Sequence, residues 1–192
     1  MKRWIIPLLL IFAIGCPKNI QQIPGSFRDD VDIYYPLKAS YSWSYLLTQD
    51  GSTQIIKTEV VQINGEEIKL SSNNNIFYYI RTEEGILKRQ ANYYILKKPI
   101  AKGVSWEFNT SGFYGRVQIV DILKECQVRD HTYKDCLVVE ETLKGQNILL
   151  RTVYAAGVGP VLIEEYSTIS DKPHLVTRAE LLGYSFAPKE ED

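Results

Sequence analysis

The side chains best suited to chemistry in the body of the chain are Cys126 and Cys136, which lie symmetrically about His131. If residues 130–133 form the turn of a β-hairpin, the two cysteines face each other, with Cα atoms about 4.5 Å apart, near the lower limit for a disulfide. We therefore predict a Cys126–Cys136 disulfide, which would stabilise the fold by about 2–3 kcal/mol on the chain-entropy model. Two free thiols are the alternative, because the compartment need not be oxidising and hairpin register can slip.

The same three residues could instead bind a zinc ion, since thiolate and imidazole are its usual ligands. Their spacing is looser than the C-x₂₋₄-C of structural zinc sites, and no fourth ligand lies nearby in the sequence. His131 is therefore interpreted as a turn residue, and so is His174, which follows Pro173. We predict no metal site and no cofactor.

Support for hydrolytic chemistry is weak. The chain has two histidines and no G-x-S-x-G motif, which argues against a Ser-His-Asp hydrolase. Adjacent carboxylates occur at Glu140–Glu141 and Glu164–Glu165, but neighbours on a strand point to opposite faces of the sheet. They cannot flank one substrate bond from the same side, as the two acids of a glycosidase do. We expect these four side chains to be solvated charges and the protein not to be an enzyme.

Alternating polar and apolar residues define the elements that carry these side chains. Tyr41–Leu47 and Val104–Phe108 are typical of strands with one buried face. Further strands are predicted at residues 54–63, 66–71, 76–82, 92–97, 117–128, 136–143, 148–154, 161–169 and 175–186. Turn dipeptides separate the runs, at Asp50-Gly51, Asn64-Gly65, Glu84-Gly85 and Lys144-Gly145. The pattern predicts an all-β domain over residues 32–187, an antiparallel meander rolled into a sandwich or an open barrel, with a charged tail at 188–192.

Aromatic side chains are candidates both for core anchors and for a binding surface. Trp43 and Trp106 are at the centres of alternating runs, so we expect both to be buried anchors rather than ligand platforms. Three pairs of adjacent tyrosines, at 34–35, 78–79 and 93–94, should each place one ring inside the sheet and one outside. Exposed tyrosines at a barrel mouth could bind a lipid tail, a sugar or a peptide, although the high β-propensity of tyrosine is the simpler explanation.

The N-terminus differs from the rest of the chain. Lys2 and Arg3 precede an apolar run from Trp4 to Gly15, and Cys16 follows. A helix over that run would span only about 18 Å, which is too short for a hydrocarbon core about 30 Å thick. The run therefore predicts an export signal rather than a membrane-spanning anchor.

Residues 12–16, Phe-Ala-Ile-Gly-Cys, resemble the lipobox of bacterial lipoproteins, with Ala13 where that motif usually has Leu. The resemblance implies that Cys16 receives a diacylglyceryl group and becomes the N-terminus after cleavage. Residues 1–15 are then a lipoprotein signal peptide, and residues 16–31 are the lipidated cysteine and a flexible tether. Two or more acyl chains give stable anchoring to a membrane. A plain secretory signal with a chance cysteine is the alternative.

Four motifs are spread in order over residues 35–161. They are Tyr35-Pro36-Leu37-Lys38 with Trp43-x-Tyr45, Lys98-Pro99-Ile100-x-x-Gly103-x-x-Trp106, Tyr133-Lys134-Asp135-Cys136-Leu137-Val138-Val139, and Tyr154-Ala155-x-Gly157-Val158-Gly159-x-Val161. Together they resemble a group of uncharacterised bacterial lipoproteins with the signatures P-L-K-x-G-x-x-W-x-Y and Y-A-x-G-V-G-x-V, although Ser40 replaces the usual Gly of the first. The resemblance implies an all-β extracytoplasmic domain and no particular activity.

The net charge of −1 gives no electrostatic footprint for nucleic acid. We predict a lipoprotein anchored on the extracytoplasmic side of the cell envelope, in the outer membrane if the organism has two, because Pro17 stands where Asp commonly signals inner-membrane retention. Its domain is predicted to be a non-catalytic binding or assembly module for a lipid, a glycan or an envelope protein. An envelope hydrolase is the alternative, which a buried carboxylate or histidine with a hydrogen-bonded nucleophile would favour.

Overall fold

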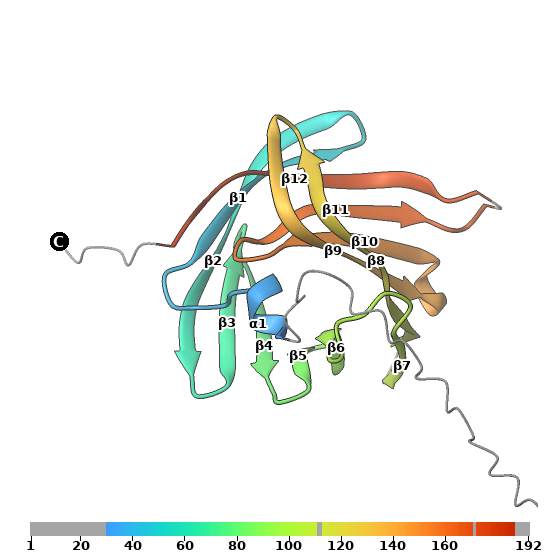
Figure 1. The fold of residues 1–192 in the computed structure, drawn as a ribbon. Helices are drawn as coiled ribbons and strands as arrows, with labels where there is room; N and C mark the ends of the chain where they lie inside the picture. The colour runs from blue at the N-terminus through green and yellow to red at the C-terminus, as the bar shows by residue number, and fades with distance from the viewer. Residues whose placement is uncertain (1–29, 111–112, 171, 187–192) are drawn as a thin grey trace, which may run out of the picture.

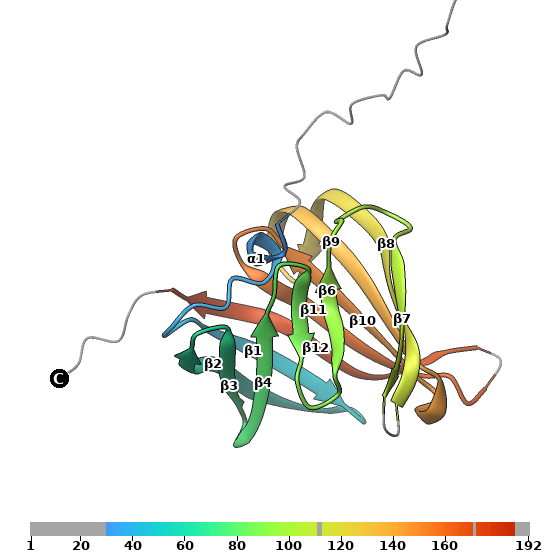
Figure 2. The ribbon, with the colours of Figure 1, turned by 90° about the horizontal axis from the view of Figure 1, so that it is seen from below.

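A computed structural model describes residues 30–110, 113–170 and 172–186 (Figure 1). They form one antiparallel sheet of 12 strands in the order β6-β5-β4-β3-β2-β1-β12-β11-β10-β9-β8-β7. The sheet curls into a nearly closed, barrel-like shape (Figures 1 and 2), which confirms the predicted antiparallel all-β meander. Within the described ranges, no helix has the length and apolar composition needed to cross a membrane.

The order of the strands amounts to two meanders, β1 to β6 and β7 to β12, which join along β1 and β12. A short helix, α1, precedes β1, and a single 3-10 turn, η1, links β9 to β10. The bounds are α1 Val31–Tyr34, β1 Ser42–Gln49, β2 Ser52–Asn64, β3 Glu67–Ser72, β4 Asn75–Arg81, β5 Gly85–Lys88, β6 Tyr93–Lys97, β7 Ser105–Thr110, β8 Phe113–Val128, β9 His131–Leu143, η1 Lys144–Gln146, β10 Ile148–Ala155, β11 Gly159–Ser167 and β12 His174–Ser185.

Turn residues with positive φ explain part of this topology. Asp50 and Gly51 have φ angles of 49° and 75° and join β1 to β2, as their dipeptide predicts. The turn predicted at Glu84-Gly85 lies between β4 and β5 and contains Glu84, but Gly85 is already the first residue of β5. That glycine lies so close to the carbonyl of Leu96 in β6 that a Cβ atom has no room. Glycine is therefore needed at position 85 because β5 and β6 pack closely there. Strand β5 itself was not predicted from the sequence.

Helix α1 and the residues after it fill one end of the barrel. Val31, Tyr34, Tyr35 and Leu37 are at most 6% exposed, so this segment is part of the core. The helix begins one residue before the predicted start of the domain. Tyr34 and Tyr35 are both buried because they are not on a strand, so the expectation of one inward and one outward ring was wrong for this pair.

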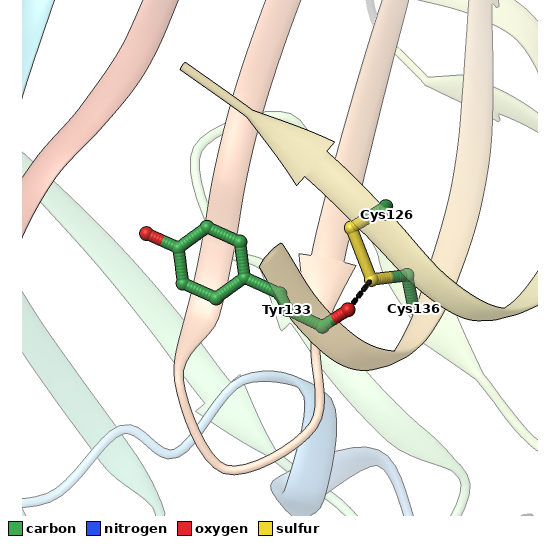
Figure 3. The surroundings of a disulfide bond; sticks show 3 residues. All are labelled: Cys126, Tyr133 and Cys136. Atoms are coloured by element: carbon green, nitrogen blue, oxygen red, sulfur yellow. Dashed lines mark hydrogen bonds between the residues drawn. A yellow bond between two sulfur atoms is a disulfide. The ribbon is translucent and has the colours of Figure 1, made fainter. Parts of the chain in front are cut away.

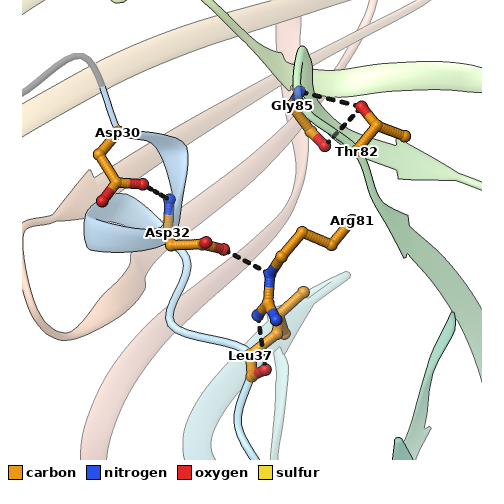
Figure 4. A network of polar contacts seen from close by, with 6 residues as sticks. All are labelled: Asp30, Asp32, Leu37, Arg81, Thr82 and Gly85. Carbon is orange, nitrogen blue, oxygen red and sulfur yellow. Dashed lines mark hydrogen bonds and ion pairs between the residues drawn. The ribbon is translucent and has the colours of Figure 1, made fainter. Parts of the chain in front are cut away.

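Arg81, at the end of β4, holds the α1 segment against the barrel (Figure 4). Its Nε donates to Oδ1 of Asp32 over 2.7 Å, and its Nη2 donates to the carbonyl of Leu37 over 2.9 Å. The next residue, Thr82, hydrogen-bonds through its hydroxyl to both the N–H and the carbonyl of Gly85 (Figure 4). The side chain of Arg81 therefore fixes the segment from α1 to Leu37 at both ends, through Asp32 and through Leu37.

Trp43 is a core anchor, as predicted. It is 1% exposed, and its Nε1 donates to the carbonyl of Val158 in the turn between β10 and β11 over 2.6 Å. The ring of Tyr35 lies edge-on to it with centroids 5.8 Å apart. Trp43 therefore ties β1, the α1 segment and the β10–β11 turn together.

The Cys126–Cys136 disulfide lies in the β8–β9 hairpin, with Cα atoms 6.1 Å apart (Figure 3). The two cysteines are not directly opposite each other, so the predicted register was wrong. Cys126 pairs with Tyr133, and Cys136 pairs with Leu123. The hairpin turns earlier than expected, at Arg129, which adopts a positive φ of 56° without being glycine. The disulfide therefore links the strands diagonally.

Candidate functional site

The two edge strands of the sheet, β6 and β7, face each other where the barrel would close (Figure 2). In the described part of the chain no backbone ladder joins them. Side chains bridge them instead. Nε1 of Trp106 donates to the carbonyl of Tyr94 over 2.7 Å, and the ring of Phe108 stacks on that of Tyr93 with centroids 4.2 Å apart. We call this line of four residues the seam.

The local sequence explains why the seam has this form. Trp106 and Phe108 are two residues apart in β7, so their rings project from the same face of the strand. Phe108 is buried, whereas Trp106 is half-buried because β7 has a strand neighbour on one side only. Trp106 therefore differs from the predicted core anchor: it packs against the core but also bridges two strand edges.

A buried carboxyl group lies behind the seam. Glu141 of β9 is 3% exposed, and its Oε2 accepts a hydrogen bond from the hydroxyl of Tyr93 over 2.6 Å. The expectation that Glu141 is solvated was wrong, because the curl of the sheet brings β6 over the inner face of β9. A signal for this was present in the sequence, since Glu141 continues the inward stripe of Leu137 and Val139 at a spacing of two.

Two further side chains complete the surroundings of this carboxyl. Lys88 of β5 pairs in register with Tyr79 of β4 on one side and with Tyr93 of β6 on the other, so the three side chains project from the same face. Both Lys88 and Tyr79 interact electrostatically with this site. We call Tyr79, Lys88, Tyr93 and Glu141 the interior cluster. It brings together residues that sequence reasoning had not connected.

Burial dominates the electrostatics of the interior cluster. It raises the pKa of Glu141, and the hydrogen bond from Tyr93 and the charge of Lys88 only partly oppose that shift. Burial also raises the pKa of Tyr93, and the charge and hydrogen bond of Glu141 raise it further. The phenol therefore keeps its proton and acts as a donor toward the carboxyl group.

More tyrosine rings line the interior beyond the cluster. Tyr35 lies 6.0 Å from Tyr79 and 5.9 Å from Tyr154, measured between ring centroids. The hydroxyl of Tyr45 donates to the carbonyl of Pro160 over 2.9 Å. Burial raises the pKa of all four of these tyrosines. The interior thus presents protonated phenols among apolar walls.

The outward members of the tyrosine pairs have different surroundings. Tyr78 lies on the other face of β4 from Tyr79, with the guanidinium of Arg89 5.7 Å from its ring. Tyr94 is half-buried, and the ammonium of Lys97 lies 5.2 Å from its ring. For these two pairs the expectation of one inward and one outward ring holds.

One member of the other carboxylate pair, Glu164, lies on the outer face of the sheet. Glu164 of β11 is 7% exposed, so it too is not the solvated charge that was expected. It lies in register between Arg151 and Arg178, and it accepts a hydrogen bond from the hydroxyl of Tyr166 over 2.8 Å. Glu140 is on the same face and pairs with Arg151 over 2.6 Å. As predicted, Glu140 and Glu141 lie on opposite faces.

Neither histidine comes near the interior cluster. His131 begins β9, ten residues along the strand from Glu141, and His174 begins β12 at a hairpin end; both are exposed. The sulfurs of Cys126 and Cys136 are joined in the disulfide, so neither is available as a thiolate ligand. Among the described residues, no three His, Cys, Asp or Glu side chains are grouped to hold a metal ion.

A pocket of about 550 Å³ lies at one end of the seam. Gln90, Ala91 and Asn92 line it from the loop between β5 and β6, and Asn109 and Thr110 line it from the end of β7. Its wall is therefore built from both edge strands and carries several carboxamides. Such groups donate and accept hydrogen bonds without charge.

The predicted lipidation site, Cys16, the signal peptide at residues 1–15 and the tether up to residue 29 lie outside the described residues.

No protein-family model matches the chain, and no curated protein matches its sequence. Three solved structures are similar to it. A Bacteroides fragilis protein, assigned as exported and with a YmcC-like fold, is 10% identical over 80% of this chain and 99% of that one, with a TM-score of 0.46. A Parabacteroides distasonis protein assigned as a lipoprotein is 10% identical over 81% and 100%, with a TM-score of 0.44. The MucA/MucB complex of Pseudomonas aeruginosa matches at 12% over 80% and 54%, with a TM-score of 0.39.

Proposed function

We propose that this chain is a lipid-anchored protein of the bacterial cell envelope, and that its domain is a non-catalytic binding module whose ligand enters at the seam. The observation that carries the binding role is that, among the described residues, no backbone ladder joins β6 to β7, and contacts made by the side chains of Trp106 and Phe108 bridge the two strands. The anchoring role is supported by the lipobox-like residues that end at Cys16.

Opening the seam breaks no backbone ladder between the described strands. Parting β6 from β7 breaks the Trp106–Tyr94 hydrogen bond and the stack of Phe108 on Tyr93, and it uncovers the two buried rings of that stack. A net hydrogen bond contributes about 0.5–1.5 kcal/mol and an aromatic pair about 0.5–1.5 kcal/mol beyond its buried area. Opening between two paired strands would instead break a full ladder. The edge at the seam is therefore the place where this sheet admits a ligand most easily.

The chemistry behind the seam fits binding. Phenols, a carboxyl group and an ammonium group lie behind the seam among aromatic and aliphatic walls, which suits a ligand with an apolar or ring-shaped body and a polar group. The hydroxyls of Tyr93 and Tyr45 already donate to Glu141 and Pro160, so a ligand binds there by exchanging for such a bond. A lipid, a glycan and a peptide segment of an envelope protein all contain such parts. The pocket at the end of the seam adds uncharged hydrogen-bonding groups.

A hydrolase receives less support from this geometry. Glu141 is a buried carboxyl group, but its hydrogen-bonded neighbour is Tyr93, whose raised pKa keeps the phenol protonated and unsuited to nucleophilic attack. The adjacent carboxylate of Glu140 is on the other face and paired with Arg151. The criterion of an activated nucleophile beside a buried acid is therefore not met.

The test is to purify the mature protein from membranes of the native host and to analyse it by mass spectrometry. We expect an acylated N-terminal peptide at Cys16 and a co-purifying ligand. Glu141→Gln and Trp106→Phe, which alter the interior cluster and remove the seam hydrogen bond, should lower the ligand content. Glu140→Gln, one residue away on the outer face, is the matched control and should retain it. An unmodified N-terminus would refute the anchor, and equal ligand content in all variants would refute the seam.

A further inference from the structure

Strand β1 begins beside the end of β12 (Figure 1), and aromatic side chains gather there. The ring of Tyr41 stacks on that of Phe186 with centroids 4.1 Å apart, and Tyr184 lies 4.8 Å from Phe186. We call Tyr41, Tyr184 and Phe186 the aromatic rim.

Core packing explains only part of the rim. Phe186 lies 6.1 Å from the buried ring of Trp43 and helps to cover it. Tyr184, opposite Trp43 in register, remains 49% exposed, and Tyr41 and Phe186 are half-buried. The rim therefore keeps aromatic surface in contact with solvent, which makes it a candidate interaction site.

The rim and the end of the tether are attached to the same turn. In the β10–β11 turn, the N–H of Gly157 donates to the carbonyl of Ile33 in α1 over 2.7 Å. The next carbonyl, that of Val158, accepts from Trp43, on which the rim packs. Asp30 caps helix α1, so the tether that leads to Cys16 joins the described chain at this helix. The residues from Cys16 to Asp30 span at most about 50 Å when fully extended, so the anchor places the rim within reach of the bilayer.

We infer that the aromatic rim rests on the surface of the bilayer to which the chain is anchored, among the headgroups of neutral phospholipids. Tyrosine rings are favoured at that depth because their apolar bodies meet the acyl chains while the hydroxyl remains hydrated, and the ring of Phe186 adds apolar surface between them. A short tether gives the rim a high effective concentration at the membrane, so weak contacts suffice. Removal of Lys2 and Arg3 with the signal peptide changes the net charge from −1 to −3, because 20 basic and 23 acidic residues remain, so there is no reason to invoke anionic lipid. The inference rests on the proposed lipidation of Cys16.

The test uses the full lipidated chain in phosphatidylcholine vesicles. An environment-sensitive fluorophore is attached through Tyr184→Cys in the rim or, as the matched control, through Ile169→Cys. Ile169 is 80% exposed in the connection between β11 and β12, away from the rim in the sequence and in Figure 1. Iodide in the water and nitroxide-labelled lipid in the vesicle quench the probes from opposite sides. Circular dichroism checks that both variants are folded.

We expect the probe at 184 to be shielded from iodide severalfold relative to the probe at 169, and to be quenched by nitroxide lipid where the control is not. Equal quenching of the two probes in vesicles would overturn the inference. So would shielding at 184 that increases with protein concentration in detergent, since it would mean that a second copy covers the rim. Failure of the lipid anchor gives a different result, because the protein would then not float with the vesicles and its N-terminal peptide would be unmodified.

Discussion

Gly159, the first residue of β11, lies against the indole of Trp43 in β1: a Cβ atom at position 159 would be 3.0 Å from Nε1 of that ring. The residue before it, Val158, accepts the hydrogen bond of the same indole, and Pro160 after it accepts from Tyr45. The first and last of the four sequence motifs therefore meet in space. Gly159 in the last motif must be small because the indole of Trp43 in the first motif fills the space beside it.

Gly159→Ala tests this contact. Gly159 has a φ of 109°, which strains any other residue, and the added methyl group would also press on Trp43. We expect a loss of about 1–3 kcal/mol from overpacking in addition to the backbone strain. Gly157→Ala is the matched control, since Gly157 has a φ of 75° but open space around it. Equal losses in urea denaturation for the two variants would contradict the role of the indole contact.

The two tryptophans should differ in their contribution to stability. Trp43→Ala removes a fully buried ring and should lower the free energy of unfolding by about 3–5 kcal/mol. The neighbours of the ring belong to different elements and cannot all move in to fill the cavity. Trp106→Ala removes a half-buried ring at a strand edge and should cost less. Thermal unfolding of both variants measures the difference. A Trp43 variant as stable as the Trp106 variant would show that Trp43 is not the anchor.

Regular alternation made most of the strands predictable, because each has one face in the interior. Strand β5 was not predictable in this way: it has four residues, and its glycine imitates a turn while it serves close packing against Leu96. The register of the β8–β9 hairpin was missed because its turn uses Arg129 rather than glycine or asparagine at positive φ. Local sequence carries little information on either point.

The interior cluster was unpredictable for a different reason. Glu141 and Tyr93 are 48 residues apart, and only the curl of the whole sheet brings β6 over β9. The alternation places Glu141 on the inward face, but it does not predict which side chain will hydrogen-bond to the carboxyl group. The seam was equally hidden, since a meander pattern does not say which strands are the edges.

The pH dependence of stability should reveal the buried carboxyl group. Because burial raises the pKa of Glu141 in the folded state, the neutral form is favoured there. The corresponding stability is fully present below the unfolded pKa, near 4.5, and is lost as pH rises through the raised folded value. Glu141→Gln cannot ionise and still accepts from Tyr93, so its melting temperature relative to the unmodified protein should rise from pH 4 to pH 8. A constant difference across that range would contradict a raised pKa.

The disulfide should contribute a measurable share of the stability. It closes a loop with a sequence separation of 10, for which the chain-entropy model gives about 2–3 kcal/mol. The double variant Cys126→Ser/Cys136→Ser should unfold at correspondingly lower urea concentration. Reductant should destabilise the unmodified protein and leave the double variant unchanged. If reductant has no effect on either protein, the cysteines are not bonded in the purified protein.

Arg81 should control the local stability of the α1 segment more than that of the whole domain. Its ion pair with Asp32 and its bond to the carbonyl of Leu37 are about one-third exposed on the arginine side, and pairs of this kind contribute only about 0.2–1 kcal/mol to global stability. Yet they are what joins α1 and Leu37 to β4, so Arg81→Ala should speed amide hydrogen exchange over residues 31–38 while the melting temperature changes little. Arg89→Ala, which breaks an exposed pair between the residue after β5 and Glu67 of β3, is the control and should leave exchange in that segment unaltered. Unchanged exchange over residues 31–38 in the Arg81 variant would mean that burial of Val31, Tyr34 and Leu37 alone holds the segment in the barrel.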